Sequence, residues 1–444
     1  MGIKERMSAD AKVFEEIVEL LLEAYFKERA PDRMVEYVLA SKVPHGAPAR
    51  NFQELIFLKA AALIPPALLL RKSGPRYLQA VSMGEVMSRL RGFIRENYVL
   101  IAREMDRKKF ETSFAANVSD DGKVILATAL SKSEVFHPVN RLLVFPITPM
   151  SVETDFVCDD FFFCKPASLP SHLPNWVNPA KITPTTMPPF LNPVGTPRPV
   201  EAWLGVRAPA DEAAKKTKRI VLGAIALTPL QRDRYMFTLR EVLKNYCYFG
   251  KESGTISSLA HTPPLGDGIV IRDCDQPWLQ ELARIIKSDQ KADLLKRNAL
   301  EYFYRAWFLD RVERCPVMFM ALDAIFGQEG TDKATAKMKA GIENTLGEER
   351  IGEKLNIMMV LRNLVLHGAA PDVYFSSKYR KYYEKFEADL VSDLELITAK
   401  CLRKYIFGTR FVPQDDPHAE LIAKHQAWGT IPSVGPDSIV VEWP

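Results

Sequence analysis

The chain has 444 residues, of which 47% are hydrophobic and 26% are charged, and its formal net charge at pH 7 is +4. This length allows two or three domains with sizeable cores, and the composition excludes collagen-like, wholly disordered and disulfide-scaffold proteins. Because the charge is small, we expect any nucleic-acid-binding surface to be local rather than spread over the protein.

We expect no membrane segment, secretory signal or metal site. The most apolar run, 55–70, is interrupted by Lys59 and two prolines, and it is shorter than the roughly 20 residues that a membrane span requires. The six cysteines have no Cys-x-x-Cys spacing, which argues against both a structural zinc site and a disulfide framework. These features predict a cytoplasmic protein without a bound metal or cofactor.

The first 165 residues mix helix and strand patterns. Apolar residues at helical spacing predict helices, and short apolar runs beside turn signals predict strands. No constellation of catalytic residues stands out in this part. We therefore expect residues 1–165 to form an α+β domain with a sensing or regulatory role. The predicted helices are 11–28, 53–64 and 82–105, and the predicted strands are 124–128, 142–147 and 156–164.

A proline-rich segment follows. Ten of the 31 prolines lie between Pro166 and Pro199. Proline lacks a backbone N–H and interrupts helices, so this density predicts an extended segment. We expect residues 166–216 to be a connector that marks the main domain boundary. The basic run 215–219 is expected to be a solvated linker face.

The remainder is predicted to be mainly α-helical. Residues 217–408 begin with two candidate strands, 220–227 and 268–271, and continue as amphipathic helices joined by short loops, which is typical of a helical bundle. The bundle core is expected to span about 290–408, with a tail over 409–444. The predicted helices are 233–246, 278–286, 294–312, 316–326, 334–346, 351–367 and 377–406.

One of these helices carries an unusual polar set, Arg362, Asn363 and His367. Asn363 and His367 are four residues apart and share a helical face. Arg362 lies about 140° away from His367 around the helix axis, but its long side chain can swing towards the same side. In an arbitrary protein, such an Arg often ends in a salt bridge and a His before a capping Gly often bonds a terminal carbonyl, and this structural interpretation stays open.

The same stretch resembles the HEPN superfamily, specifically the Apea-like HEPN domains of prokaryotic defence proteins. The hallmark of these domains is Arg, a polar residue, a few apolar residues and His. A preceding helix pair, 305–311 and 320–326, also matches, and the resemblance covers about 217–408. Two departures occur: Asp323 stands where Glu is usual, and Ala369 stands where some members carry Tyr.

The resemblance implies a metal-independent endoribonuclease whose active groove forms where two domains meet, and hence a homodimer. His367 would supply acid or base catalysis, Arg362 would stabilise the phosphorane, and Asn363 would orient the His or bind phosphate. Asp323 would support the site, or it could be a core residue paired with Arg311 or Arg362. The substrate would be RNA, with tRNA one candidate, and a phage-derived trigger or regulatory partner would act on the N-terminal domain.

Two other interpretations remain open. The HEPN region could be catalytically inactive and serve in RNA or protein binding and dimerisation, because of the two departures. Alternatively, the N-terminal part could carry the main activity.

A basic and aromatic run follows the motif. Cations neutralise phosphates and aromatic rings stack on unpaired bases, so such a run suits single-stranded RNA. The alternative is a helix whose tyrosines pack inward and whose lysines are solvated. The predicted RNA-binding residues are Lys378, Tyr379, Arg380, Lys381, Tyr382 and Lys385.

Overall fold

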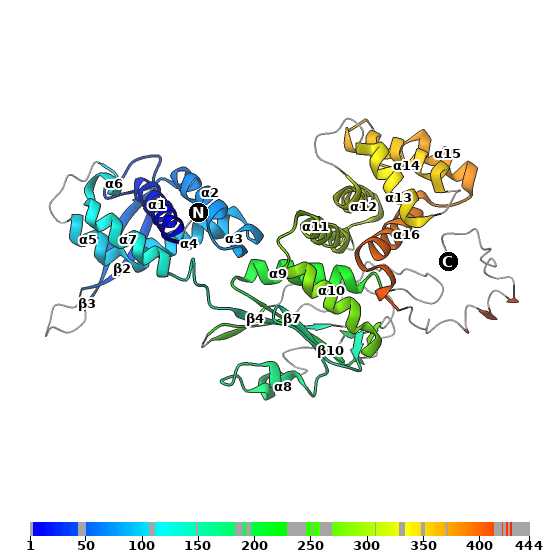
Figure 1. The fold of residues 1–444 in the computed structure, drawn as a ribbon, viewed down its shortest axis with the longest axis horizontal. Coiled ribbons are helices and arrows are strands. Elements are labelled where there is room, and N and C mark those ends of the chain that lie inside the picture. Colours follow the sequence, from blue (N-terminus) through cyan, green and yellow to red (C-terminus); the bar gives the residue numbers. More distant parts are fainter. Residues whose placement is uncertain are drawn as a thin grey trace. The chain divides into compact units, whose positions relative to one another are not determined.

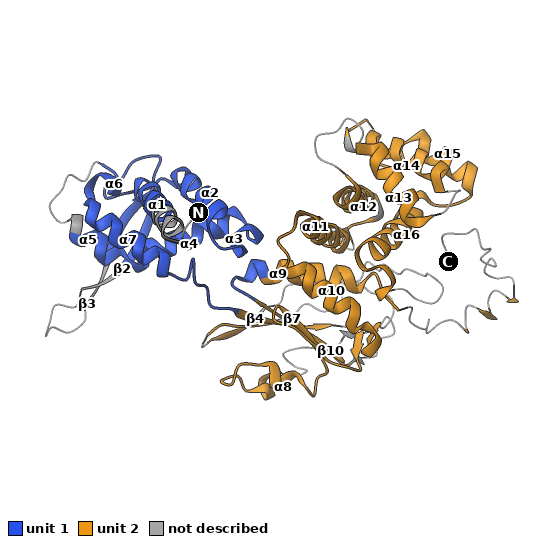
Figure 2. Cartoon of the chain, in the orientation of Figure 1, with its two compact units in different colours: residues 1–140, 208–213 blue, residues 141–207, 214–444 orange. Residues whose placement is uncertain are grey.

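The computed structural model divides into two compact units, residues 1–140 with 208–213 and residues 141–207 with 214–444 (Figure 2). We describe each unit by itself. The residues that the structure describes are 3–42, 50–105, 112–147, 150–182, 190–191, 197–228, 246–251, 253–257, 269–306, 308–327, 334–347, 351–369, 372–412, 420, 423–424 and 427–428.

The first unit is a mixed α/β unit with an antiparallel sheet of strand order β1-β3-β2 (Figure 1). Helix α1 packs against α2, α6 and α7. The strands are β1 (Tyr25–Phe26), β2 (Met34–Lys42) and β3 (Arg50–Leu58). The helices are α1 (Ile3–Glu23), η1 (Ala60–Leu63), α2 (Ile64–Ser73), α3 (Tyr77–Ala80), α4 (Met83–Glu96), α5 (Tyr98–Met105), α6 (Phe114–Asn117) and α7 (Asp120–Lys132).

Two predictions in this unit are wrong. The helix predicted over 53–64 is largely strand β3, whose nine residues pair with all nine of β2. The strand predicted over 124–128 lies inside α7. The residues before it signal a helix start rather than a turn, because the Ser119 hydroxyl accepts a hydrogen bond from the Gly122 N–H and two acidic residues occupy the first turn.

The second unit begins with a six-stranded sheet of order β12-β11-β4-β10-β7-β6 (Figure 1). The strand predicted over 142–147 is confirmed, whereas the single strand predicted over 156–164 is two short strands, β6 and β7, that pair antiparallel. The strands are β4 (Arg141–Ile147), β6 (Phe156–Val157), β7 (Phe161–Cys164), β10 (Ala202–Ala208), β11 (Tyr246–Phe249) and β12 (Gly254–Ser257). Separately, β5 (Met150–Val152) pairs in parallel with β13 (Ile269–Ile271), which confirms the predicted strand at 268–271.

Both faces of the six-stranded sheet are covered, so its central strands are apolar throughout. All four side chains of β7 are buried. One face packs against Leu169 of α8 (Leu169–His172). On the other face, Lys218 of α9 (Asp211–Ile225) lies over the Phe145 ring. A strand that is buried on both faces therefore lacks the alternation of apolar and polar residues that is typical of a half-exposed sheet.

The proline-rich segment connects two strands of one sheet rather than two domains. Strand β7 before it pairs antiparallel with β10 after it, and the division between the units falls at residues 140 and 141. The predicted connector 166–216 therefore includes β10 (202–208), where six of seven residues are buried, and the first residues of α9, 211–216. The other short elements between β7 and β10 are η2 (Pro179–Lys181), β8 (Phe190–Leu191) and β9 (Pro197–Arg198).

The strand predicted over 220–227 is also wrong, since 220–225 is the end of helix α9. A short apolar run is compatible with either a buried strand or a buried helix segment. The charged stretch 211–219 before it forms the first turns of α9. Its acidic residues Asp211 and Glu212 lie in the first turn, where negative charge stabilises a helix. Gly223 allows α9 to approach α11 closely, because a Cβ there would lie 2.2 Å from the Leu300 carbonyl oxygen.

The rest of the unit is mostly helical, as predicted. Helix α12 contacts α11, α13, α14 and α16. The helices are η3 (Asp273–Asp275), α10 (Gln276–Lys287), α11 (Lys291–Ala306), α12 (Arg311–Phe326), α13 (Ala334–Leu346), α14 (Ile351–Leu366), α15 (Ser377–Phe386), α16 (Leu390–Leu402), the π-helical turn η4 (Arg403–Phe407) and η5 (Gly408–Arg410).

Several helix boundaries differ from prediction. The single helix expected over 377–406 is interrupted at Glu387, whose φ is 52°. The helix expected over 294–312 ends at Ala306. Helix α12 begins at Arg311 rather than at Pro316, because the Asp310 carboxylate accepts hydrogen bonds from the first-turn backbone N–H groups. The helix expected over 233–246 lies outside the described residues except for its last residue, which begins β11.

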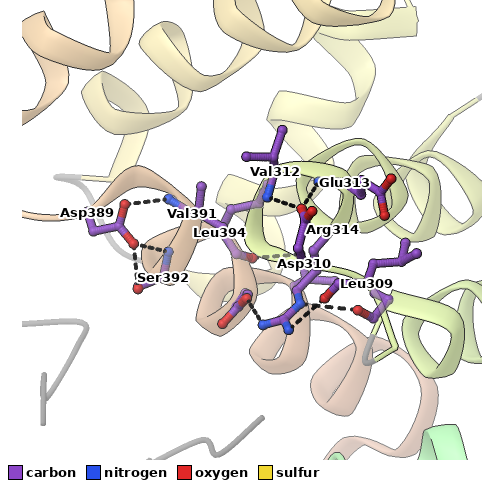
Figure 3. Close-up of polar contacts among 12 residues, drawn as sticks. Leu309, Asp310, Val312, Glu313, Arg314, Asp389, Val391, Ser392 and Leu394 are labelled. Atoms are coloured by element: carbon purple, nitrogen blue, oxygen red, sulfur yellow. Dashed lines mark hydrogen bonds and ion pairs between the residues drawn. The ribbon is translucent and has the colours of Figure 1, made fainter. Parts of the chain in front are cut away.

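Arg314 connects three of these helices (Figure 3). Its buried guanidinium donates to the carbonyl oxygens of Ala306 and Leu309, at 3.1 and 3.0 Å, and to the Glu395 carboxylate at 2.6 Å. The end of α11, the start of α12 and the middle of α16 are thereby held together. None of the helices in the described part of the chain is both long and apolar enough to cross a bilayer.

Candidate functional site

The predicted motif lies at the C-terminal end of α14. Arg362 and Asn363 are in its last two turns, and His367 is the first residue beyond it. Gly368 has a φ of 71°, and its N–H donates to the Val365 carbonyl at 3.1 Å. The Ala369 N–H donates to the Leu364 carbonyl at 2.8 Å. This pair of bonds is a Schellman motif, which confirms the predicted glycine cap.

The cap determines where His367 lies. Its backbone N–H still donates to the Asn363 carbonyl, at 3.0 Å, while its side chain is exposed. Within the described residues, the imidazole forms no hydrogen bond or ion pair. The imidazole therefore bonds no carbonyl of a described residue, but the salt bridge that the structural interpretation expects for Arg362 is present, with Asp323.

Arg362 is held by Asp323 of α12. The two side chains form an ion pair, with exposed fractions of 15% for Arg362 and 30% for Asp323. Arg362 Nη1 also donates to Asn363 Oδ1 at 3.1 Å. The partner of Asp323 is therefore Arg362, and the shorter Asp side chain reaches it without the usual Glu.

One N–H donor of this guanidinium has no hydrogen-bond acceptor among the described residues. This donor is Arg362 Nε, which is buried. A buried donor without an acceptor is costly, and such groups often mark a place where a ligand or water completes the hydrogen bonding. A phosphate oxygen has the charge and geometry that a guanidinium prefers.

The surface around the motif is partly apolar. On α14, Asn356, Val360, Asn363 and His367 follow one another at spacings of three and four residues, and Val360 is 44% exposed. On α12, Met320 is 39% exposed one turn before Asp323. Helices α12 and α14 therefore each expose an apolar residue near the polar set.

The structure separates the six residues of the basic and aromatic run. Tyr382 is fully buried, and its hydroxyl donates to the Asp393 carboxylate. The same carboxylate accepts from Lys354 Nζ at 2.6 Å. Burial and the neighbouring Asp393 charge raise the pKa of Tyr382 above its usual value. This ring is therefore not available to stack on a base, which corrects its predicted role.

Three more of the predicted RNA-binding residues are engaged within the protein. Arg380 pairs with Glu384 at 2.7 Å, and Lys385 pairs with Glu353 at 2.8 Å. The Tyr379 hydroxyl donates to Asp389 at 2.8 Å.

The remaining two residues, Lys378 and Lys381, form no ion pair with any described residue. They are the cations of this run that stay uncompensated.

Sequence reasoning missed two aromatic residues between the motif and α15. Phe375 is 77% exposed and Tyr374 is 41% exposed. The pattern Asp-x-aromatic-aromatic-Ser before a helix could have located them, because Asp and Ser bind backbone N–H groups in turns and at helix N-termini.

The basic run 215–219 is not a solvated linker face, because Lys218 is buried in α9. Its ammonium lies 5.2 Å from the Phe145 ring centroid and 5.4 Å from that of Tyr304. Burial, together with the nearby charges of Arg219 and Lys215, lowers the pKa of Lys218 to about 7. This position has no distinctive sequence signal.

The remaining titratable groups do not assemble into an obvious metal centre. All six cysteines are free thiols. Among the residues that the structure describes, no cluster of three or more His, Cys, Asp or Glu side chains could hold a metal ion.

Comparison of the chain with protein-family models, with curated proteins and with solved structures gives no match.

Proposed function

We propose that the chain is a metal-independent endoribonuclease of the HEPN type with an Apea-like C-terminal region, and that Arg362, Asn363 and His367 carry cleavage. The observation that carries this proposal is the exposed imidazole of His367, at the cap of the same helix end that holds Arg362 and Asn363. An accessible imidazole beside a guanidinium is the pair of groups that RNA cleavage by internal transesterification uses.

In the proposed reaction, the ribose 2′-oxygen attacks the adjacent phosphorus and its proton passes to a base. The bond from phosphorus to the 5′-oxygen breaks, and an acid protonates that oxygen, which leaves a 2′,3′-cyclic phosphate and a 5′-hydroxyl. His367 serves as acid or base, and a homodimer brings a second His367 for the other role.

Arg362 stabilises the negative charge on the phosphorane. Asp323 fixes the orientation of the guanidinium, and Asn363 accepts from Nη1. The buried Nε is a donor for which a non-bridging phosphate oxygen is a suitable acceptor.

The proposal includes a biological setting. The protein acts in the cytoplasm in anti-phage or abortive-infection defence, where RNA cleavage stops growth of the infected cell. The N-terminal unit senses a phage-derived trigger or binds a regulatory partner.

The test is RNA cleavage by purified protein, together with growth toxicity on induced expression. We expect His367→Ala to abolish both while the circular dichroism spectrum and thermal transition stay unchanged. His137→Ala is the matched control, because His137 is also exposed but lies in the first unit. Cleavage by His367→Ala at the wild-type rate, or no RNA cleavage by the wild type under any trigger, contradicts the proposal.

A second candidate is a catalytically inactive HEPN module for binding or dimerisation. The observation that favours it is the Arg362–Asp323 ion pair, which compensates the charge that would otherwise attract phosphate. Unchanged toxicity of an Arg362→Ala/His367→Ala double variant would support this function over cleavage.

A further inference from the structure

The short segment between α14 and α15 presents an aromatic side chain to solvent. Phe375 is 77% exposed, more than any other large hydrophobic residue among those that the structure describes. Tyr374 beside it is 41% exposed. Large apolar side chains at such exposure are costly to keep in water and often belong to a binding surface.

This exposure is built into an ordered turn. The Asp372 carboxylate accepts hydrogen bonds from the backbone N–H groups of Tyr374, at 2.7 Å, and Phe375, at 3.1 Å. The Ser376 hydroxyl then accepts from the Lys378 N–H at 3.2 Å and caps α15. Hydrogen bonds on both sides fix the backbone of Phe375, so presenting the ring to a partner requires little further ordering.

Tyr374 connects the turn to α15 through a ring contact with Tyr379. Its ring packs edge-on against Tyr379, with centroids 4.8 Å apart, and the Tyr379 hydroxyl donates to Asp389 at 2.8 Å. Tyr374 is therefore anchored to α15 and the start of α16, whereas Phe375 is the more exposed of the two.

Within α15, the charged side chains that form no ion pair with a described residue are all positive. Arg380 and Lys385 are compensated by Glu384 and Glu353. Lys378 and Lys381 have no ion-pair partner among the described residues. An exposed ring beside two uncompensated cations suits a partner that has both flat π-faces and negative charge.

We infer that this turn binds single-stranded RNA, with Phe375 stacking on an unpaired base and Lys378 and Lys381 contacting neighbouring phosphates. The inference rests on the proposed function and specifies the substrate class, because unpaired bases stack on aromatic side chains and paired bases are shielded within the duplex. A protein partner is favoured less, because Lys378 and Lys381 follow the ring without an ion-pair partner among the described residues, although Tyr383 on the same helix is also 59% exposed.

The test separates binding from cleavage by using the full-length His367→Ala protein. Fluorescence anisotropy measures its affinity for a labelled oligouridine and for a labelled RNA duplex. We expect Phe375→Ala to weaken oligouridine binding about tenfold and Phe375→Trp to retain it, with little change for the duplex. Tyr37→Ala is the matched control, because Tyr37 is exposed in the first unit.

The lysines have their own readout. The logarithm of the binding constant falls linearly with the logarithm of the salt concentration. For a single strand, each lost phosphate contact reduces the magnitude of this slope by about 0.7. We expect this change in Lys378→Ala/Lys381→Ala. The matched control Arg380→Ala/Lys385→Ala removes cations that already have acidic partners, and it should change the slope less.

Several results would overturn the inference. They are wild-type-like oligouridine binding by Phe375→Ala, equal weakening for oligouridine and duplex, and no oligouridine binding by the parent protein. Conversion of a dimer to a monomer by Phe375→Ala, measured by light scattering, would also overturn it, because Phe375 would then be a protein contact. If Phe375→Ala leaves RNA cleavage unchanged, only this inference is rejected. If oligouridine binding depends on Phe375 but the wild-type protein cleaves no RNA, only the nuclease proposal is rejected.

Discussion

Arg362 on α14 and Asp323 on α12 form an ion pair that joins the two helices, and Arg362 lies five residues before the exposed His367. The pair identifies Arg362 as a partner of Asp323. In the proposed site this gives Asp323 a positioning role, because the carboxylate determines which edge of the guanidinium is left for a phosphate. The proposed site therefore depends on the packing of two helices as well as on one motif.

Asp323→Asn tests this positioning role. The change removes the charge but keeps the size, so we expect RNA cleavage to fall about tenfold and the free energy of unfolding to fall by about 1 kcal/mol. Asp323→Glu keeps the charge, and its activity should stay within a few-fold of the wild type. The measurements are cleavage rates and urea denaturation. Wild-type cleavage by Asp323→Asn would show that Arg362 needs no such support.

The elements predicted correctly have strong local signals. Helix α13 has both of its predicted ends, 334 and 346. The end of α14 was predictable because Gly368 adopts a positive φ at little cost, and the backbone after the last helical turn requires this conformation. Buried strands such as β4 were also recognisable from their dense apolar runs.

Some failures overlooked local helix caps, such as Ser119 before α7, and others occur where tertiary packing decides between local alternatives. Residues 220–225 are apolar enough for a strand, but they continue the helix that starts at Asp211, and α9 packs against the sheet and α11. The buried position of Tyr382 depends on Asp393, which is eleven residues later and on another helix. Spacing alone placed six residues in one RNA-binding run, but it could not show which cations already have acidic partners.

Arg314→Met tests the connection among α11, α12 and α16. The change leaves the Glu395 carboxylate and two carbonyl oxygens without this donor in a largely buried setting. We expect the free energy of unfolding to fall by about 3–5 kcal/mol, measured by urea denaturation. Arg305→Met is the control, since Arg305 is exposed on α11 and should change stability by less than about 0.5 kcal/mol. Equal effects of the two variants would contradict the role of Arg314.

Lys218 should make stability depend on pH. Its pKa in the folded protein is about 7, against 10.5 for an unperturbed lysine, chiefly because of burial. Between these pH values the unfolded state binds one more proton than the folded state, so the contribution of this residue to stability rises with pH. Below pH 7 both states are protonated, and the full cost of burying the charge is present.

We therefore expect Lys218→Met to be stabilising below pH 7, with an advantage that shrinks towards pH 10.5. The measurement is the difference in urea midpoint between variant and wild type across this range. Lys216→Met is the control, because Lys216 is half-buried and pairs with Glu301 at 3.8 Å. A pH-independent difference for Lys218→Met would show that Lys218 does not titrate as stated.

Two helical glycines give a matched test of the packing of α9 against α11. A Cβ at Gly223 would lie 2.2 Å from the Leu300 carbonyl oxygen, whereas a Cβ at Gly92 in α4 would meet no described atom within 4 Å outside its own helix backbone. We expect Gly223→Ala to lower the free energy of unfolding by about 2–3 kcal/mol, because the backbones must move apart. Gly92→Ala should raise it by about 0.5–1 kcal/mol, since alanine is the better helix former. Urea denaturation measures both changes, and a stabilising Gly223→Ala would mean that α9 does not approach α11 this closely.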